Sequence, residues 1–341
     1  MNRGLLAVLA GLTAAQAQAV DTLRFEAREV VAGETRLENV SARLRLTSAS
    51  TTEATVDIAR VRPGEGLPSL EQLHLVCHKP VIADPRFGCD AATLSVARTP
   101  IGPLSFTLSG DFRTDVSIGQ GRATLAKLAG GRLEVEGRAS PQRWQLRGDA
   151  RDLQVAELRS LLAPWYSLPE GWTLAGRAGA KFSARGGATP VHAEVTLALA
   201  NLNLSNEAST LIAEETAATL ELALDAREGG YDLDATARGE RGQALAGPVL
   251  LDFNSNPFTL RTRGSWRGDT VDLAQIEATA PQLLALHGNA TLTLGATPEL
   301  ALGRLVIEAL EFPAAYTSLM QITLAATDFG DLVTAGRASG T

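Results

Sequence analysis

The chain has 341 residues, of which 45% are hydrophobic, 20% are charged and only 5% are aromatic, and its formal net charge is −7. Apolar residues are abundant enough to bury substantial area, but they are mostly Leu, Ala and Val. Because the charge is acidic and dispersed along the chain, the basic footprint that nucleic-acid binding needs is missing. We therefore expect no nucleic-acid partner.

The N-terminus has the pattern of a cleavable signal peptide. Arg3 precedes an apolar run at 5–12, and the small-x-small triplet that ends at Ala19 follows it. A membrane anchor is the alternative, but this run is much shorter than the roughly 20 residues that cross a bilayer. Residues 1–19 are thus predicted to be removed, which leaves an exported, periplasmic protein that is soluble or attached by its surface.

Both cysteines of the chain, Cys77 and Cys89, lie in one short stretch that contains two prolines and a glycine. Since export exposes thiols to oxidants, we expect a disulfide that pins a hairpin. The alternative is a metal site completed by His74 and His78, but the paired short spacings typical of zinc sites are absent. The sequence therefore favours a structural disulfide, with no metal and no cofactor.

Alternation of apolar and polar residues, which is typical of half-buried strands, recurs along almost the whole chain. It predicts a hairpin of 133–139 with 144–150 across Ser140-Pro141, and another of 220–224 with 231–235 across residues 228–230. In the segment 191–204 the parity of the apolar positions changes, which predicts a bulge or bend near Asn201. The repeated spacing favours antiparallel meanders.

Two short helical segments interrupt the predicted strands. Apolar residues at helical spacing predict a helix near 152–163, which Pro164 ends. A second helical turn is expected between Pro313 and Met320, where Phe312, Tyr316 and Leu319 could pack on a sheet.

Three features favour one elongated sheet over a closed globule. Inward residues are small or aliphatic, no linker divides residues 20–341, and the last residues resemble the start of a further strand. About twenty strands, each adding about 4.8 Å, would form an object up to about 100 Å long. We therefore predict a mainly β fold, an elongated antiparallel sheet curled into a groove, with one or two short helices. The ending also raises the alternative of a chain truncated at its C-terminus.

Several phrases resemble the AsmA-like superfamily. They are LQVAELRSLLAPW followed by LAGRAGAKFSARGG, and LVIEALEFPAAYTSLMQITLAATDFGDLVTAGRASG near the end. The cysteine pair ahead of TPIGPLSFTLSG resembles the YdbH-type branch, once labelled dicarboxylate transport and now grouped with intermembrane phospholipid transport. The resemblance implies a taco-like β-groove that carries phospholipid acyl chains between the inner and outer membranes. Family members are usually longer, and many keep an N-terminal anchor.

Under this resemblance, the apolar faces of the later strands would line the groove. The alternative is that the same residues fill a closed sandwich core. The groove candidates are Val195, Leu197, Leu220, Leu222, Leu284, Leu286, Leu292 and Leu294.

The sequence offers no recognisable enzymatic motif. It contains no G-x-S-x-G, no H-E-x-x-H and no Walker loop, and its few aromatic residues do not favour carbohydrate work. His192 and His287 are predicted to point away from the apolar residues of their strands. We therefore expect a non-enzymatic protein that binds or conducts phospholipid. The alternative is an envelope assembly factor or structural scaffold that pairs with outer-membrane proteins, its partner adding a strand at an open sheet edge.

Overall fold

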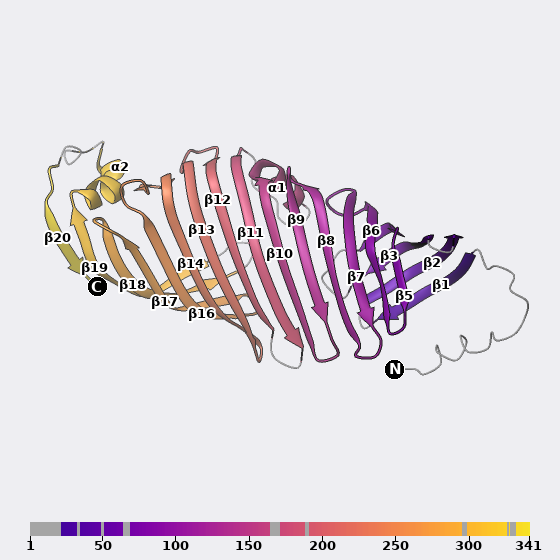
Figure 1. Cartoon of the computed structure of the whole chain (residues 1–341). Coiled ribbons are helices and arrows are strands. Elements are labelled where there is room, and N and C mark those ends of the chain that lie inside the picture. The colour runs from indigo at the N-terminus through magenta and orange to yellow at the C-terminus, as the bar shows by residue number, and fades with distance from the viewer. Residues whose placement is uncertain are drawn as a thin grey trace, which may run out of the picture.

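A computed structural model of the whole chain contains one antiparallel sheet of 20 strands and only short helices (Figure 1). The structure describes residues 22–32, 35–48, 51–63, 69–163, 171–187, 191–294, 299–325, 327 and 332–341. The predicted signal peptide, residues 1–19, lies outside this part of the chain. Within the described residues, no helix has the length and apolar character needed to span a membrane.

The strands follow one another as a meander, as the sequence predicts. Their bounds are β1 (Thr22–Ala32), β2 (Thr35–Ser48), β3 (Thr51–Arg62), β4 (Leu70–Cys77), β5 (Pro80–Ala83), β6 (Arg86–Arg98), β7 (Leu104–Arg113), β8 (Ile118–Leu128), β9 (Gly131–Ala139), β10 (Arg143–Gln154), β11 (Thr173–Gly187), β12 (His192–Ser205), β13 (Leu211–Arg227), β14 (Gly230–Ala246), β15 (Val249–Asp252), β16 (Phe258–Arg267), β17 (Thr270–Ala280), β18 (Leu284–Thr293), β19 (Glu299–Phe312) and β20 (Gly336–Gly340).

Each strand pairs with the next one, except around the two shortest strands. β4 and β5 both pair with β6, and β15 and β16 both pair with β14. The two predicted hairpins are present: Gly137 lies opposite Leu146 in the first, and Leu224 lies opposite Leu233 in the second. Because all these connections are local, alternation along the sequence translates directly into two chemically distinct faces.

The helical segments are α1 (Val155–Leu162), the π-helical turn η1 (Tyr316–Met320) and α2 (Gln321–Leu324). The first starts three residues later than predicted, because residues 152–154 still belong to β10 and Asp152 has a positive φ of 56°. The second predicted turn is found: Ala315 and Tyr316 are buried, and Phe312 and Leu319 pack nearby. Both helical segments therefore pack on the sheet.

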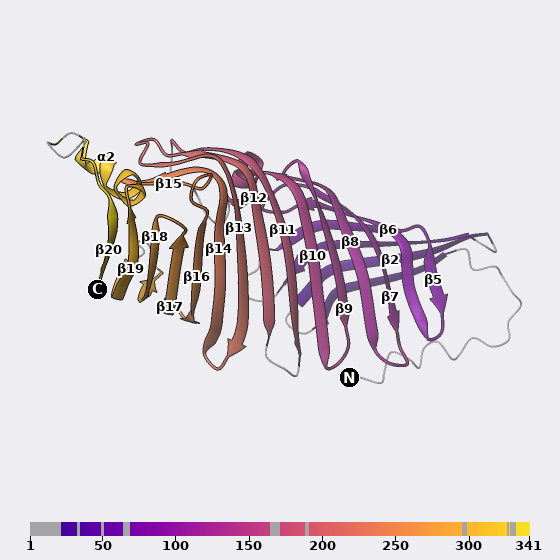
Figure 2. The ribbon, with the colours of Figure 1, turned by 60° about the vertical axis from the view of Figure 1, so that its left-hand side comes forward.

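A line of irregularities crosses the consecutive strands β10–β14. Each of these strands contains a residue with positive φ beside a shift in pairing register, and the prediction of a bulge near Asn201 is confirmed by its φ of 51°. The residues are Asp152, Gly176, Asn201, Glu215 and Gly242. A bulge bends its strand and increases the local twist. Aligned bulges therefore crease the sheet, and the ends of β13 and β14 turn over toward β15 (Figure 2).

The predicted disulfide joins Cys77 at the end of β4 to Cys89 in β6, with Cα atoms 5.9 Å apart. The alternative metal site is wrong. Cys77 lies opposite Ala92 on one face of the sheet, whereas His74 lies opposite Ser95 on the other face, with its Nδ1 2.6 Å from a carboxylate oxygen of Asp57. Residues on opposite faces cannot converge on one ion.

Candidate functional site

One face of the sheet carries an unbroken apolar row along its whole length. Directly paired residues in adjacent strands point to the same face, with Cβ atoms about 5 Å apart. One residue each from β1–β4, β6–β14 and β16–β19 forms the row, and every one is apolar. The members are Phe25, Ala42, Val56, Leu75, Leu94, Phe106, Leu125, Leu133, Ala150, Ala180, Leu197, Leu220, Ala237, Leu260, Ala278, Leu286 and Ile307.

A second row on the same face runs beside the first through the same strands. All its members are apolar or glycine except Thr262. They are Leu23, Leu44, Ala54, Cys77, Ala92, Leu108, Ala123, Val135, Gly148, Phe182, Val195, Leu222, Ala235, Thr262, Ile276, Gly288 and Leu305. We call the side of the sheet to which both rows point the apolar face.

The opposite face is polar to the same degree. The row that lies between the two apolar rows, but points the other way, contains Arg24, Arg43, Thr55, Val76, Thr93, Thr107, Thr124, Glu134, Asp149, Lys181, Thr196, Glu221, Thr236, Arg261, Glu277, His287 and Val306. Only two of these are apolar. The sheet is thus long and amphipathic, with one polar face and one apolar face.

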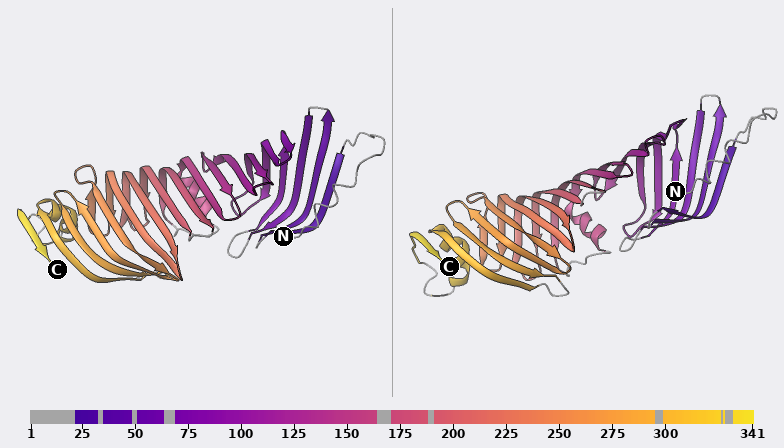
Figure 3. Two further views of the ribbon diagram at one scale, coloured as in Figure 1. Left: turned by 60° about the horizontal axis from the view of Figure 1, so that its bottom comes forward. Right: turned by 90° about the horizontal axis from the view of Figure 1, so that it is seen from below.

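The apolar face is the concave one. The strands at both ends of the sheet bend toward the side on which α1 lies (Figures 1 and 3). Under α1, a buried cluster contains Ala150 and Ala178, and Leu197 packs against it, so the helix sits on the first apolar row. The cluster beneath η1 contains Ala280, which lies on the same face. Two short helices therefore cover two places on this face, and no second sheet closes it among the described residues.

All eight predicted groove residues lie on this face or at its margin, but their surroundings differ. Leu197 packs against the cluster under α1, and Leu284 against the one under η1, although both are themselves half-buried. By contrast, Val195 is 37% exposed, Leu220 is 40% exposed, and Leu294, directly after β18, is 37% exposed. Leu222, Leu286 and Leu292 are half-buried.

Sequence reasoning missed the aromatic side chains near the hairpin ends of this face. Trp144 is 37% exposed and Phe112 is 44% exposed, and both lie on the apolar face, as do Phe87, Tyr231 and Trp266. A signal was available in the segment 104–112, where Leu104, Phe106, Leu108, Gly110 and Phe112 alternate with polar residues. Large exposed apolar residues gathered in this way usually mark an interaction surface.

The polar face holds ion pairs. A cleft of about 550 Å³ in β6–β10 is lined by side chains of both signs, including Arg147, and Arg122 pairs there with Glu136. Farther along, Arg263 Nε lies 2.8 Å from Asp234. Exposed pairs of this kind contribute little to stability, but they keep this face hydrated.

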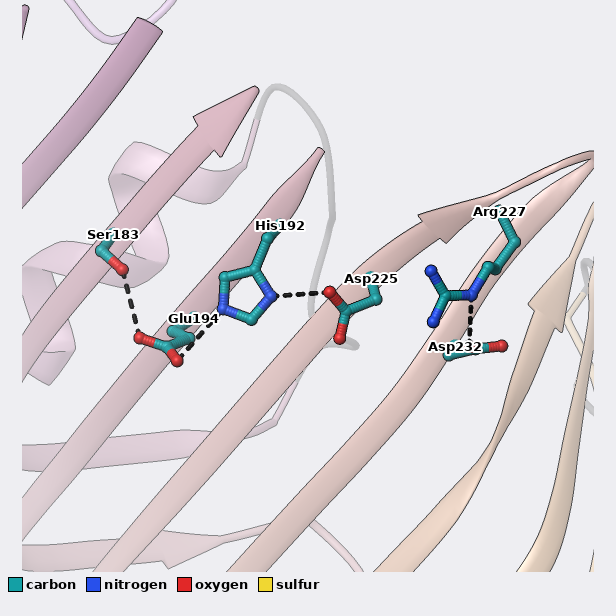
Figure 4. Close-up of polar contacts among 6 residues, drawn as sticks. All are labelled: Ser183, His192, Glu194, Asp225, Arg227 and Asp232. Atoms are coloured by element: carbon teal, nitrogen blue, oxygen red, sulfur yellow. Dashed lines mark hydrogen bonds and ion pairs between the residues drawn. The ribbon is translucent and has the colours of Figure 1, made fainter. Parts of the chain in front are cut away.

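His192 joins a small network on the same polar face (Figure 4). Its Nδ1 lies 2.7 Å from an oxygen of Asp225, its Nε2 lies 3.1 Å from Glu194, and Ser183 donates a hydrogen bond to Glu194. The hydrogen bond with Asp225, followed by that with Glu194, raises the pKa of His192 above its ordinary value. The same imidazole lowers the pKa of both carboxyl groups. His192 and His287 thus point away from the apolar face, as predicted; His287 Nδ1 lies 2.9 Å from Glu308.

No group of three or more metal-ligating side chains occurs in the part of the chain that the structure describes. Comparisons with protein-family models, with curated proteins and with solved structures found no match to this chain. What the molecule does must therefore be argued from the continuous apolar face itself.

Proposed function

We propose that the chain binds phospholipid acyl chains along its concave apolar face and conducts them between the two membranes of a cell envelope, from a position in the periplasm. The observation that carries the proposal is the pair of rows that cross the sheet from β1 to β19, the first wholly apolar and the second interrupted by one polar side chain, Thr262. A site for one small ligand would need only a local pocket, whereas these rows extend over the whole sheet.

Physical chemistry favours acyl chains as the occupant. Transfer of each methylene from water to an apolar surface is favourable by about 0.8 kcal/mol. The apolar face offers such a surface along the sheet. No polar side chain interrupts the first row, and the second row passes beside the cluster under α1 with Thr262 as its one polar member. A hydrocarbon moving along these rows therefore meets no charged side chain. The head group can stay in water because the face is open, as the 40% exposure of Leu220 indicates.

The periplasmic location is proposed on two grounds. The N-terminal pattern predicts export, and the Cys77–Cys89 disulfide is a covalent bond that persists in oxidising compartments. The resemblance to the AsmA-like superfamily points the same way. Within this proposal, transport needs no catalytic group, because the protein supplies only a path.

A matched pair of variants tests the proposal. Val195 and Thr196 are neighbours in β12 that point to opposite faces, and both are exposed. The purified full chain, incubated with phosphatidylethanolamine vesicles and analysed by native mass spectrometry, should retain lipid. Val195→Glu should lose most of it, because a carboxylate resists burial against hydrocarbon, whereas Thr196→Glu should retain it. If the wild-type chain holds no lipid, or if both variants hold it equally, the proposal fails. Capture of an outer-membrane protein by a lipid-free chain would favour the assembly-factor alternative.

A further inference from the structure

The apolar face is partly covered at its middle by α1, which changes how much of it an acyl chain could use. On β10 the residues of this face are Trp144, Leu146, Gly148, Ala150 and Leu153. The last two are buried in the cluster under α1. Only the positions from Trp144 to Gly148 lie outside that cluster, a stretch of about 14 Å at the usual rise of a strand.

The strands on either side have more free surface. On β7 the apolar-face residues run from Leu104 to Phe112, and on β13 from Ala218 to Ala226, and none of them belongs to a cluster under a helix. Each of these stretches spans about 27 Å by the same rise. The uncovered width of the apolar face thus falls to about half at β10 and β11.

Within this narrow region, two glycines lie beneath aromatic rings from the neighbouring strand. Gly148 pairs with Phe182, and Gly186 pairs with Trp144. A Cβ atom added at Gly148 would overlap the ring atoms Cζ, Cε1 and Cε2 of Phe182. A Cβ added at Gly186 would lie 2.8–3.0 Å from atoms of the Trp144 indole. Each ring therefore occupies the space that a side chain on the opposite residue would fill.

The two glycine–aromatic pairs limit how far side chains project from the apolar face in this region. Because the rings lie across glycines, the two largest side chains of the region do not stand out from the sheet. Leu146 and Ala184, the pair between them, likewise combine a large with a small residue. No large side chain therefore projects far from the apolar face beside α1.

We propose that α1 and the Gly148–Phe182 and Gly186–Trp144 pairs form a neck that controls passage of acyl chains between the two halves of the apolar face. This inference rests on the proposed function. Gly148 acts as a positioning residue, because it keeps the Phe182 ring flat against the sheet. A larger residue there would lift the ring into the path next to α1.

The test uses the full-length chain and phosphatidylethanolamine that carries a diazirine in one acyl chain. After illumination, adducts are mapped by peptide mass spectrometry. The wild-type chain should carry adducts both in the neck, at residues 144–148, and on β13, at residues 220–222. In Gly148→Leu the neck adducts should fall about tenfold. This corresponds to a penalty of about 1.4 kcal/mol on entry of an acyl chain, which is near the lower end of the cost of forcing a side chain into filled space. The β13 adducts should persist, because that region is outside the neck.

Two further variants separate the neck from general damage. Gly148→Leu combined with Phe182→Ala should restore the neck adducts, because the lifted ring is gone. Gly137→Ala is the matched control: it lies on the same face opposite Leu146, but a Cβ there would be 3.7 Å from the nearest atom. It should leave all adducts unchanged, and circular dichroism should show each variant folded.

The outcomes distinguish this inference from the proposed function. No adducts anywhere on the apolar face of the wild-type chain would refute the proposed function. Adducts on β13 with none in the wild-type neck, or unchanged neck adducts in folded Gly148→Leu, would refute the neck alone. Failure of Phe182→Ala to restore the neck adducts would also count against it, because the lifted ring is the stated cause.

Discussion

Truncation of leucines at two places on the sheet distinguishes an open apolar face from a packed core. Leu283 is 1% exposed and belongs to the cluster under η1, whereas Leu220 is 40% exposed in the middle of the first apolar row. Leu283→Ala should cost about 3–5 kcal/mol, because it removes buried methylenes and leaves a cavity. Leu220→Ala should cost only about 1.4 kcal/mol: three carbons at about 0.8 kcal/mol each, scaled by the buried share of the side chain, with no cavity term because solvent reaches the site.

Urea denaturation followed by far-UV circular dichroism measures both losses, and hydrogen exchange in β13 and β18 reports whether each loss is local. The expected result is a difference of at least about twofold between the two variants. Equal losses near the upper figure would mean that Leu220 is enclosed by protein atoms. The apolar face would then be a filled core, and the reasoning behind the proposed function would be wrong.

Three other perturbations test individual features. Replacing both cysteines with serine should lower stability by about 2–3 kcal/mol, measured by thermal unfolding, because the disulfide closes a short loop with a sequence separation of 12. The lipid content of this double variant should equal that of the wild-type chain. The pKa of His192 should lie above 6.5 in an NMR titration, and Asp225→Asn should lower it. The stabilisation by the His192–Asp225 pair should be lost as pH rises through the raised histidine pKa, and also as pH falls through the lowered carboxyl pKa. A His192 titration midpoint at or below 6.5 would contradict the network. Gly242→Ala should destabilise the sheet by about 1 kcal/mol or more, because φ is 87° and a Cβ would lie 2.5–2.6 Å from backbone oxygens of β13. Gly229→Ala should cost less, because φ is 75° but no atom lies within 4 Å of the added Cβ. Equal losses of stability would show that the tight backbone contact at Gly242 is unimportant.

Polar side chains form hydrogen bonds across the line of bulges in β10–β14. Asn203 donates from Nδ2 to the carbonyl of Asn201 and accepts the backbone N–H of Glu215 at its Oδ1, at 3.1 Å in each case. Arg241 donates to Asn201 Oδ1 at 2.9 Å. Three adjacent strands are thereby tied together at the crease. Polar side chains therefore join β12, β13 and β14 where the bulges bend them.

Much of the fold could be predicted because its determinants are local. Alternation between apolar and polar residues fixes which side of a strand is apolar, and short turns fix which strands pair. The hairpin across Ser140-Pro141 was therefore predicted, and it is present. The disulfide was predicted from the expected export and from the proximity of the only two cysteines in the sequence, and it is present. The helix at 155–162 was predicted with a start that was too early, because Asp152 extends the strand through a left-handed backbone angle that periodicity does not reveal.

The sequence by itself thus determined a long two-faced β-sheet, since side-chain direction in a strand repeats every two residues and needs no distant partner to be read. Only the tertiary structure decided which way the sheet bends, where α1 sits, and that Phe182 lies over Gly148. Those features depend on alignment between strands whose residues are tens of positions apart, and register shifts at bulges change that alignment without leaving a period in the sequence. For the same reason, the candidate residues Leu197 and Leu220 looked equivalent as alternating leucines, although one packs beneath a helix and the other faces open space.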